Sequence, residues 1–582
     1  MASWLILSVI VLPWVGGLCV WRLGDKKPGL QHALASIFAV LGGVLAVALL
    51  PFASSSSVVE IPLGGPFGSF TLIPDGLGVY LTIIASVVGC LAVIFSNDYM
   101  KGEAQLGRYY SLVLLFIGAM SGLVLSGSLL FMFIFWEITA FCSYALISFH
   151  NDDPKAVAGG IKALILTQVG GIGLLIGALI TYSYLGTYQI PDFIENAHMI
   201  PVNVLGFIAF GFLIAAAAKS AQLPFQTWLP DAMEAPTPIS ALIHAATMVN
   251  AGVYLLARFF PAFESVPGWT SAVMLVGMLS ALMAGIMAVV ANDLKRTLAY
   301  STISQLGYMV YAIGCGAVFA SQFHLMSHSV FKALLFLGAG AVIHTVGTRD
   351  MREMGGLGKL MPFTRLVFII GAAGLAGIPI ANGFFSKELL LEGGMVGGPF
   401  WAYLVMLLVA GITAFYSLRM VWMVFYGEAQ NKAHFHDAPS RMRISLFLLA
   451  LGTLLTWLLV GPFSELLANT LPFHEIHAAS TITFIVEILT APATWVALAI
   501  VAAGLALWLM RDRITGLARI LKPLGTIAEK SFGFEWINQQ IIRGTQRIAE
   551  GLRRTQTGQL NWNVVGIVGG LVIVLIVLAW GI

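Results

Sequence analysis

The stretch FHLMSHSVFKALLFLGAGAVIH, residues 323–344, carries three ionisable side chains in a run that is otherwise apolar or small. His324, His328 and Lys332 are spaced i, i+4 and i+8, so on a helix they form one stripe about 12 Å long. If this helix crosses a bilayer, inserting each group costs about 2.5–3.5 kcal/mol. The stripe therefore indicates a proton or ion relay through a membrane; the alternative is a polar contact between helices that is satisfied internally.

The composition is that of an all-α polytopic membrane protein. Of the 582 residues, 59% are hydrophobic and 10% are charged, whereas globular domains carry about 25% charged residues. Apolar runs of about 20 residues, the length that a helix needs to cross a bilayer, recur along the chain. We expect about sixteen transmembrane helices. The expected spans are 3–21, 31–53, 76–97, 110–127, 129–149, 160–186, 202–222, 238–260, 270–291, 298–319, 323–345, 364–388, 398–426, 444–463, 482–510 and 562–581.

Basic residues are distributed unevenly between the loops. If each loop is numbered by the helix that it follows, nearly all loop Lys and Arg residues fall in odd loops, and the even loops carry Arg258 alone. The positive-inside rule then puts the odd loops in the cytoplasm and both termini on the other side of a cytoplasmic (inner) or equivalent energy-coupling membrane. Because these charges lie in loops rather than on a soluble basic face, we expect no nucleic-acid partner.

Two predicted helices combine a buried lysine with a break. Lys219 ends the run FGFLIAAAAKS, and Pro224 is expected to break or kink the helix just beyond it. Lys387 follows Pro379 and Gly383 in GLAGIPIANGFFSKELL. Interrupted helices at corresponding places, here helices 7 and 12, are typical of transporter repeats with a site in the middle of the membrane. The alternative is a lysine that snorkels from a helix end.

Glu137 and His244 complete a series of buried ionisable groups. Glu137 lies well inside its helix, and His244 lies one turn into helix 8, between the helices of Lys219 and Lys332. A lone histidine is either a packing residue or part of a relay, and the sequence leaves both open. In a Glu–Lys–His–Lys–Lys series, a change of charge at one site changes the proton affinity of the next, and histidines can pass protons between sites.

Motifs for other chemistry are absent from the sequence. There is no Walker A loop, no nucleotide-binding GxGxxG and no HExxH, and the four cysteines are scattered without a CxxC pair. We therefore expect no metal site, no bound cofactor and no redox centre in this chain. The loop histidines at 434, 436, 474 and 477 are interpreted as surface residues.

The last odd loop, residues 511–557, is long, basic and sparsely amphipathic. This pattern is typical of helices that lie in the membrane interface, with Pro523 and Gly525 expected to interrupt them. It predicts either a lateral strap against neighbouring subunits or an ordinary basic loop.

Several long segments together resemble the antiporter-like subunits of respiratory complex I and their Mrp-type relatives. The similarity covers about residues 70–430, and PDGLGVYL near Pro74 and QTGQL before the last span resemble the subunit L (chain 5) branch. The other segments that carry it are FIFWEITAFCSYALISFHND, AAAAKSAQLPFQTWLPDAMEAPTPISALIHAATMVNAGVYLLAR, NDLKRTLAYSTISQLGYM, FHLMSHSVFKALLFLGAGAVIH and GFFSKELL.

The resemblance implies two inverted five-helix repeats and a role for each buried group. Glu137 and Lys219 would form a coupled pair, Lys387 would be the terminal proton-exchange lysine, and the central axis would hold His244, His324, His328 and Lys332. The implied domains are 1–109 (helices 1–3), 110–260 (first repeat), 270–426 (second repeat), 444–510 (helices 14–15), 511–560 (lateral segment on the cytoplasmic side) and 562–581 (transmembrane anchor).

The function implied is proton translocation by a membrane subunit of an NADH-quinone oxidoreductase, a translocase. Its partners would be other membrane subunits, with an adjacent antiporter-like subunit contacted by residues 511–560, and the lipid bilayer. The ions moved would be protons, or Na⁺. FMN, iron–sulfur clusters and quinone would belong to partner subunits.

Two departures from the subunit L pattern keep other members of the superfamily open. The stretch TQVGGIGLL carries Gln168 and Gly171 where subunit L has a basic residue and an aspartate, and we expect Gly171→Asp to be tolerated because it restores a carboxylate near Lys219. The lateral stretch would be at most about 70 Å long if wholly helical, shorter than is usual for subunit L.

The alternatives are a subunit of a multisubunit Na⁺/H⁺ antiporter, the membrane arm of an energy-converting hydrogenase or formate-linked complex, and a proton-driven partner of a soluble enzyme such as an inorganic-carbon pump. A structural scaffold with a defunct channel is a different class, and the intact set of Glu137, Lys219, Lys332 and Lys387 argues against it.

Overall fold

The computed structural model describes residues 2–54, 58–428, 436–513 and 515–555. The chain divides into a large unit, Met1–Gly525, and a small one, Thr526–Ile582. The predicted last span, 562–581, and His434 lie outside the described residues.

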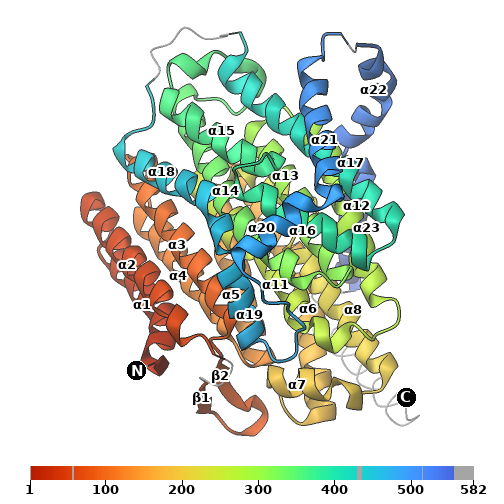
Figure 1. The fold of residues 1–582 in the computed structure, drawn as a ribbon. Helices are drawn as coiled ribbons and strands as arrows, with labels where there is room; N and C mark the ends of the chain where they lie inside the picture. Colours follow the sequence, from red (N-terminus) through yellow and green to blue (C-terminus); the bar gives the residue numbers. More distant parts are fainter. Residues whose placement is uncertain (1, 55–57, 429–435, 514, 556–582) are drawn as a thin grey trace. The chain divides into compact units, whose positions relative to one another are not determined.

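Most of the large unit consists of α-helices that run side by side (Figure 1). Those before residue 291 are α1 (Ala2–Arg22), α2 (Pro28–Ala48), α3 (Gly76–Tyr99), α4 (Leu106–Leu125), α5 (Leu129–Ile147), α6 (Pro154–Leu185), α7 (Ile190–Asn196), α8 (Val202–Lys219), α9 (Trp228–Asp231), α10 (Thr237–Ala241), α11 (Met248–Phe263) and α12 (Trp269–Val290). Those that follow are α13 (Leu294–Gly314), α14 (Val318–Val346), α15 (Pro362–Ala376), α16 (Asn382–Gly397), α17 (Phe400–Val421), α18 (Ser440–Leu455), α19 (Val460–Thr470), α20 (Thr481–Thr490) and α21 (Pro492–Leu509).

The two strands of the described chain form a hairpin between α2 and α3. Strand β1 (Val59–Pro62) pairs antiparallel with β2 (Ser69–Leu72), and Val59 lies opposite Leu72. The hairpin lies at the same end of the large unit as α7 (Figure 1).

Thirteen helices within the described residues are long and apolar enough to cross a membrane. The prediction of a mostly helical, multi-pass membrane protein is therefore confirmed. Span 364–388, where the sequence predicts a break, is divided into α15 and α16, because Gly377 adopts φ +78° and ends α15. One predicted single span differs from the structure. Span 482–510 is divided into α20 and α21, and Pro492 begins the second helix.

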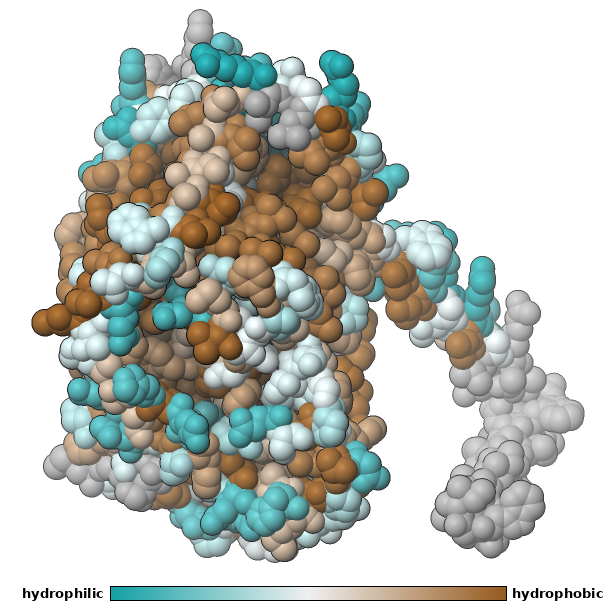
Figure 2. All heavy atoms as spheres, turned by 45° about the vertical axis from the view of Figure 1, so that its right-hand side comes forward, coloured by the Kyte–Doolittle hydropathy of each residue, from teal (hydrophilic) through white to brown (hydrophobic). Residues whose placement is uncertain are grey.

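The outer helices present apolar side chains to their surroundings. Figure 2 shows hydrophobic side chains over the middle of one face of the molecule and hydrophilic side chains at both ends. On α6, Ile161, Ile165, Ile172 and Ile176 are all exposed along the helix. This is the distribution expected of helices that contact lipid.

The helices that carry most of the predicted relay residues lie inside this layer. All residues from 235 to 259 are buried, and in α14 so are all those from 320 to 342 except Val330. The ionisable stripe of α14 therefore faces other helices rather than lipid.

The C-terminal helices of the described chain are α22 (Thr515–Glu529) and α23 (Phe534–Thr555). The predicted interruption at Pro523 and Gly525 is wrong, since both residues lie inside α22. The interruption lies farther on, where Ser531, Phe532 and Gly533 all have positive φ and cannot continue a right-handed helix.

Candidate functional site

Lys219 is the last residue of α8 and is fully buried. Its Nζ donates a hydrogen bond to the Trp136 carbonyl of α5 at 2.8 Å and lies 4.8 Å from the centroid of the Trp136 ring. The helix stops here as predicted: residues 220–227, which include Pro224, are not helical. The freed Ala218 carbonyl accepts a hydrogen bond from Trp228 Nε1 at 2.9 Å.

Glu137 follows Trp136 on α5 and faces α6 rather than contacting Lys219 directly. Its Oε2 accepts a hydrogen bond from Gln168 Nε2, while Oε1 finds no hydrogen-bond donor among the described residues. A Cβ atom on Gly171 would lie 2.5 Å from this Oε1. Lys219 bonds to the Trp136 carbonyl rather than to Glu137. The charges of Glu137 and Lys219 still interact.

His244 lies in a π-helical turn, Leu242–Ala246, that joins α10 to α11. Such turns interrupt the regular α-helical hydrogen bonds and are frequent at functional sites. The imidazole is fully buried between the rings of Trp228 and Phe336, with centroid distances of 6.2 and 5.8 Å. Neither ring nitrogen has a hydrogen-bond partner in the described part of the chain.

The α14 stripe begins, on the side of His244, with Lys332. Its Nζ donates to the Leu298 carbonyl of α13 at 3.1 Å and to Ser301 Oγ. One turn away, His328 is fully buried, and neither of its ring nitrogens has a partner in the ranges described. The ring centroids of His328 and His324 lie 6.4 Å apart.

His324 connects the stripe to α16. Its Nδ1 lies 2.9 Å from Ser386 Oγ and its Nε2 lies 3.2 Å from Gln305 Oε1 of α13. Because Ser386 precedes Lys387 in the chain, the stripe ends beside the second interrupted helix.

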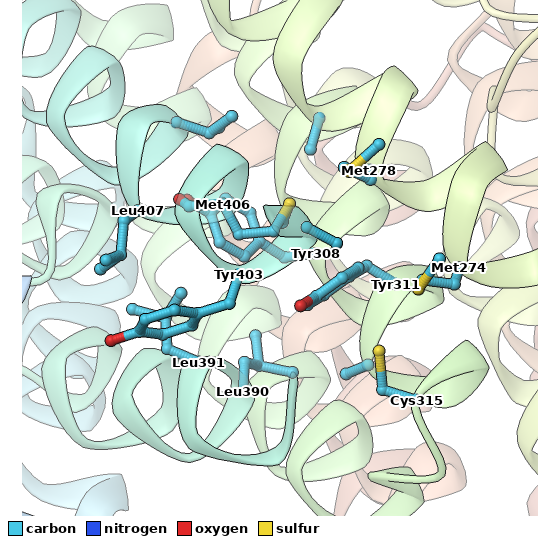
Figure 3. Packing of buried hydrophobic residues seen from close by; sticks show 14 of the residues in the cluster. Met274, Met278, Tyr308, Tyr311, Cys315, Leu390, Leu391, Tyr403, Met406 and Leu407 are labelled. Atoms are coloured by element: carbon cyan, nitrogen blue, oxygen red, sulfur yellow. The ribbon is translucent and has the colours of Figure 1, made fainter. Parts of the chain in front are cut away.

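Lys387 is the sixth residue of α16, just after the break between α15 and α16. Its Nζ donates to the Leu375 carbonyl at 2.5 Å and lies 5.7 Å from the centroid of the Tyr308 ring. Tyr308 belongs to an apolar cluster that α12, α13, α16 and α17 form (Figure 3). Pro379 lies in the break, whereas Gly383 is the second residue of α16, where a Cβ atom would lie 1.8 Å from the Gly374 carbonyl oxygen.

The three lysines share one kind of anchor. Each donates a hydrogen bond to a backbone carbonyl of another helix. A charged ammonium has three N–H donors and a neutral amine has two, so either form can make this bond. A lysine held in this way can take up or lose a proton without leaving its position.

Two residues that the sequence assigns to loops lie inside the protein. Lys295 is 3% exposed and donates to the Ala235 carbonyl at 2.6 Å. Arg258 belongs to α11 and makes a two-fold hydrogen-bonded ion pair with Asp75, so its assignment to an even loop is wrong. Hydropathy alone did not reveal these two interactions, because Ala235 and Asp75 lie far from Lys295 and Arg258 in the sequence.

The loop histidines do not all lie at the surface. His477 is exposed, but His474 is only partly exposed, and its Nε2 lies 2.8 Å from the Ala257 carbonyl oxygen. Burial lowers the pKa of His474, the bond to Ala257 raises it, and the charge of Arg258 lowers it.

Across the part of the chain described here, no group of three His, Cys, Asp or Glu side chains could hold a metal ion.

Comparison with known proteins identifies the same central region. The family described as NADH:quinone oxidoreductase/Mrp antiporter, transmembrane, matches residues 126–413. Subunit L of the NADH-quinone oxidoreductase of Escherichia coli (strain K12) is 37% identical over 543 residues, which cover 88% of this chain and 87% of that protein. Subunit L of the F(420)H(2) dehydrogenase of Methanosarcina mazei is 42% identical over 417 residues, 65% of this chain and 62% of that one.

Two solved structures share the fold. The Mrp complex of a Dietzia species contains a chain that matches with a TM-score of 0.85 and 28% identity; the match covers 99% of this chain and 63% of that longer one. A membrane-bound sulfane sulfur reductase, an archaeal respiratory membrane complex, matches with a TM-score of 0.71 and 25% identity over 83% of this chain.

Proposed function

This chain belongs to the family of antiporter-like membrane subunits that includes subunit L of NADH-quinone oxidoreductase, and we propose that it carries protons across the membrane for a complex of that kind. Protons pass along a buried relay formed in order by Glu137, Lys219, His244, Lys332, His328, His324 and Lys387. Electron transfer takes place in other subunits, which hold the FMN, iron–sulfur clusters and quinone.

One observation carries this proposal: ionisable groups follow one another through the buried helices, anchored in a way that suits both protonation states. Lys219, Lys332 and Lys387 bond to carbonyls of α5, α13 and α15. His244 and His328 have ring nitrogens that no described residue occupies. Since buried polar atoms without a protein partner usually bind water, these nitrogens support a hydrated path between the lysines.

The relay is driven by charge. When Glu137 gains or loses a proton, the charge that Lys219 senses changes, and the proton affinity of each following site changes in turn. A redox-driven change of charge in a neighbouring subunit needs to act only on Glu137, the first group of the relay. Na⁺ is a second possible cargo of the same path.

The test is proton translocation by the assembled complex. We expect Lys219→Ala and Glu137→Ala to abolish acidification of membrane vesicles when the complex is supplied with its electron donor, because each variant removes one of the first two groups. Both variants should still assemble. Wild-type acidification by both would remove the first half of the chain from the pathway.

A second candidate is a subunit of an Mrp-type multisubunit Na⁺/H⁺ antiporter without a redox partner. The TM-score of 0.85 to the Mrp complex chain favours it. Gln168 and Gly171 also favour it, because they stand where subunit L has a basic residue and an aspartate. Purification from the native membrane distinguishes the candidates. Flavin and iron–sulfur subunits would support the oxidoreductase, small membrane subunits alone the antiporter, a nickel-containing partner a hydrogenase, and a soluble zinc enzyme a carbon pump.

The architecture that we propose for the whole chain has about sixteen membrane spans and two inverted five-helix repeats, at 110–260 and 270–426. Residues 1–109 and 444–510 flank the repeats, and 562–581 anchor the chain. The strong bias of Lys and Arg to one set of loops supports both termini on the non-cytoplasmic side of an energy-coupling membrane. The segment 511–560, with exposed Ile537 and Ile541 on α23, would lie against an adjacent antiporter-like subunit.

A further inference from the structure

A cavity of about 210 Å³ is lined by residues of α7 and by Ile73, which follows β2. Helix α7 and the β1–β2 hairpin lie at one end of the large unit (Figure 1). The cavity lining includes the buried Asp75–Arg258 pair together with His474, Thr470 and Ile194. Asp75 and Arg258 are 4% and 7% exposed. The relay described above uses none of these residues.

The carboxylate of Asp75 is held firmly. It caps α3 by accepting a hydrogen bond from the Gly78 amide at 2.9 Å, and Arg258 Nη2 donates to it at 2.8 Å. Removing two charges from water costs several kcal/mol for each ion, so a buried pair of this kind is weak evidence for stability alone. A carboxylate at the wall of a cavity can also exchange a proton with the water that fills it.

A polar stripe leads from this pair toward the centre of the membrane. Asn250, Tyr254 and Arg258 are spaced i, i+4 and i+8 on α11 and so span about 12 Å. Arg258 Nε donates to the Tyr254 hydroxyl at 3.2 Å. At the other end, Asn250 Nδ2 donates to Ser329 Oγ of α14 at 3.1 Å, and Ser329 is the neighbour of His328 in the chain.

A second contact runs beside the first. The Tyr80 hydroxyl of α3, five residues after Asp75, donates to Gln322 Oε1 of α14 at 2.5 Å. Gln322 Nε2 and Asn250 Oδ1 have no partner within the described ranges. Two polar contacts of α14, one with Asn250 of α11 and one with Tyr80 of α3, therefore carry hydrogen-bonding groups that no described residue uses, which is where water would bind.

From this arrangement we infer that the relay has a branch that ends in a proton-release site formed by Asp75, Arg258 and His474. A proton that leaves His328 passes along the Asn250–Tyr254 stripe through water and forms an O–H bond on Asp75, which weakens its ion pair with Arg258. That bond breaks when the proton moves to water in the cavity, and Arg258 then restores the carboxylate form. No electrons move in this step. The inference rests on the proposed function of proton translocation.

The groups that face Asp75 fit this role. Arg258 donates hydrogen bonds to both carboxylate oxygens of Asp75, so the ion pair re-forms after each release. His474 lines the same cavity, and when its Nε2 donates to Ala257 its Nδ1 is left to accept a proton or a hydrogen bond. Tyr80 and Tyr254 are the other titratable groups near the pair. The Tyr254 hydroxyl accepts from Arg258 Nε and donates to the Val124 carbonyl at 2.9 Å, and the Tyr80 hydroxyl donates to Gln322.

The test is Asp75→Asn in the assembled complex in vesicles, with Asp192→Asn as the control. Asn keeps the size of the side chain and can still cap α3, but it is not a proton acceptor at neutral pH. Asp192 is an exposed carboxylate on α7 at the same end. We expect proton translocation per assembled complex to fall at least two-fold in Asp75→Asn and to stay at the wild-type value in Asp192→Asn.

A structural role for the pair would lower the amount of complex, so translocation is divided by the amount assembled. If Asp75→Asn fails to assemble, Tyr254→Phe and Asn250→Ala test the branch instead, because they interrupt the stripe and keep both charges of the ion pair. Wild-type translocation by these two variants, or by assembled Asp75→Asn, overturns the branch. Lys219→Ala in parallel separates the two proposals, since normal translocation by that variant contradicts the relay itself.

Discussion

At the scale of single residues, the most informative feature is a lysine with a carbonyl as its partner. Lys332 bonds to the Leu298 carbonyl and to Ser301 Oγ, and none of the ion pairs in the described chain includes it. A carboxylate partner would hold the lysine in its charged form, whereas these neutral acceptors bind either form. The arrangement favours exchange of the proton over a permanent charge.

This argument predicts that the ability to lose a proton matters more than the charge itself. Lys332→Arg keeps a donor and a positive charge, but a guanidinium does not deprotonate in proteins. We expect translocation by the assembled complex to fall at least ten-fold in Lys332→Arg. Lys155→Arg, at an exposed position in the first turn of α6, is the control and should leave translocation unchanged. Equal rates in both variants would show that Lys332 acts only through its charge.

Gly171 gives a second prediction at this scale, and the structure adds a contact that the sequence did not show. An aspartate at 171 would restore a carboxylate near Lys219, but a Cβ atom there lies 2.5 Å from Glu137 Oε1. The new carboxylate would lie beside that of Glu137, and neighbouring like charges disfavour the charged form of both groups. We expect Gly171→Asp to assemble and to lower translocation several-fold. Gly171→Ala adds the Cβ atom without the charge, so an equal loss in both variants would indicate crowding alone.

At the scale of helices, the two breaks position two of the lysines. The end of α8 places Lys219 beside α5, and the break between α15 and α16 lets Lys387 reach back to the Leu375 carbonyl. In the second break, α16 begins in close contact with α15, and Gly383 makes this approach possible because it has no Cβ.

This contact predicts a sharp effect of one methyl group. In Gly383→Ala the new Cβ would lie 1.8 Å from the Gly374 carbonyl oxygen, which belongs to the backbone and cannot rotate away. We expect the amount of folded subunit in the membrane, measured by blotting, to fall several-fold. Gly206→Ala in α8 is the matched control, because its Cβ would meet only Val266 at an ordinary 3.6 Å. A normal amount of Gly383→Ala would mean that α16 can shift without loss.

The sequence predicted those features that depend on local pattern. The α14 stripe follows from the period of the helix, and the breaks follow from Pro224 and Pro379. It did not predict partners that only the packing of distant helices brings together. Arg258 is a single charge in the sequence until Asp75, 183 residues away, forms its ion pair. Gln305 and Ser386 are likewise ordinary polar residues until they meet His324.

At the scale of the whole molecule, the question is whether the two halves work in series or separately. The α14 stripe connects them: Lys332 lies on the side of His244, and His324 contacts Ser386, the neighbour of Lys387. In one continuous relay a block ahead of the Asp75 branch stops the flow. Two separate half-channels would each carry part of the flow and lose only that part.

We therefore expect Lys219→Ala, which lies ahead of the Asp75 branch, to lower translocation by at least ten-fold. Lys387→Ala should leave only the flow that the branch carries, and the double variant should be no lower than Lys219→Ala. The measurement is the initial rate of vesicle acidification, divided by the amount of assembled complex in each membrane. Effects in a series are strongly non-additive, whereas independent routes add. If each single variant kept about half of the wild-type rate and the double variant kept none, α14 would be a barrier between two channels rather than the connection between them.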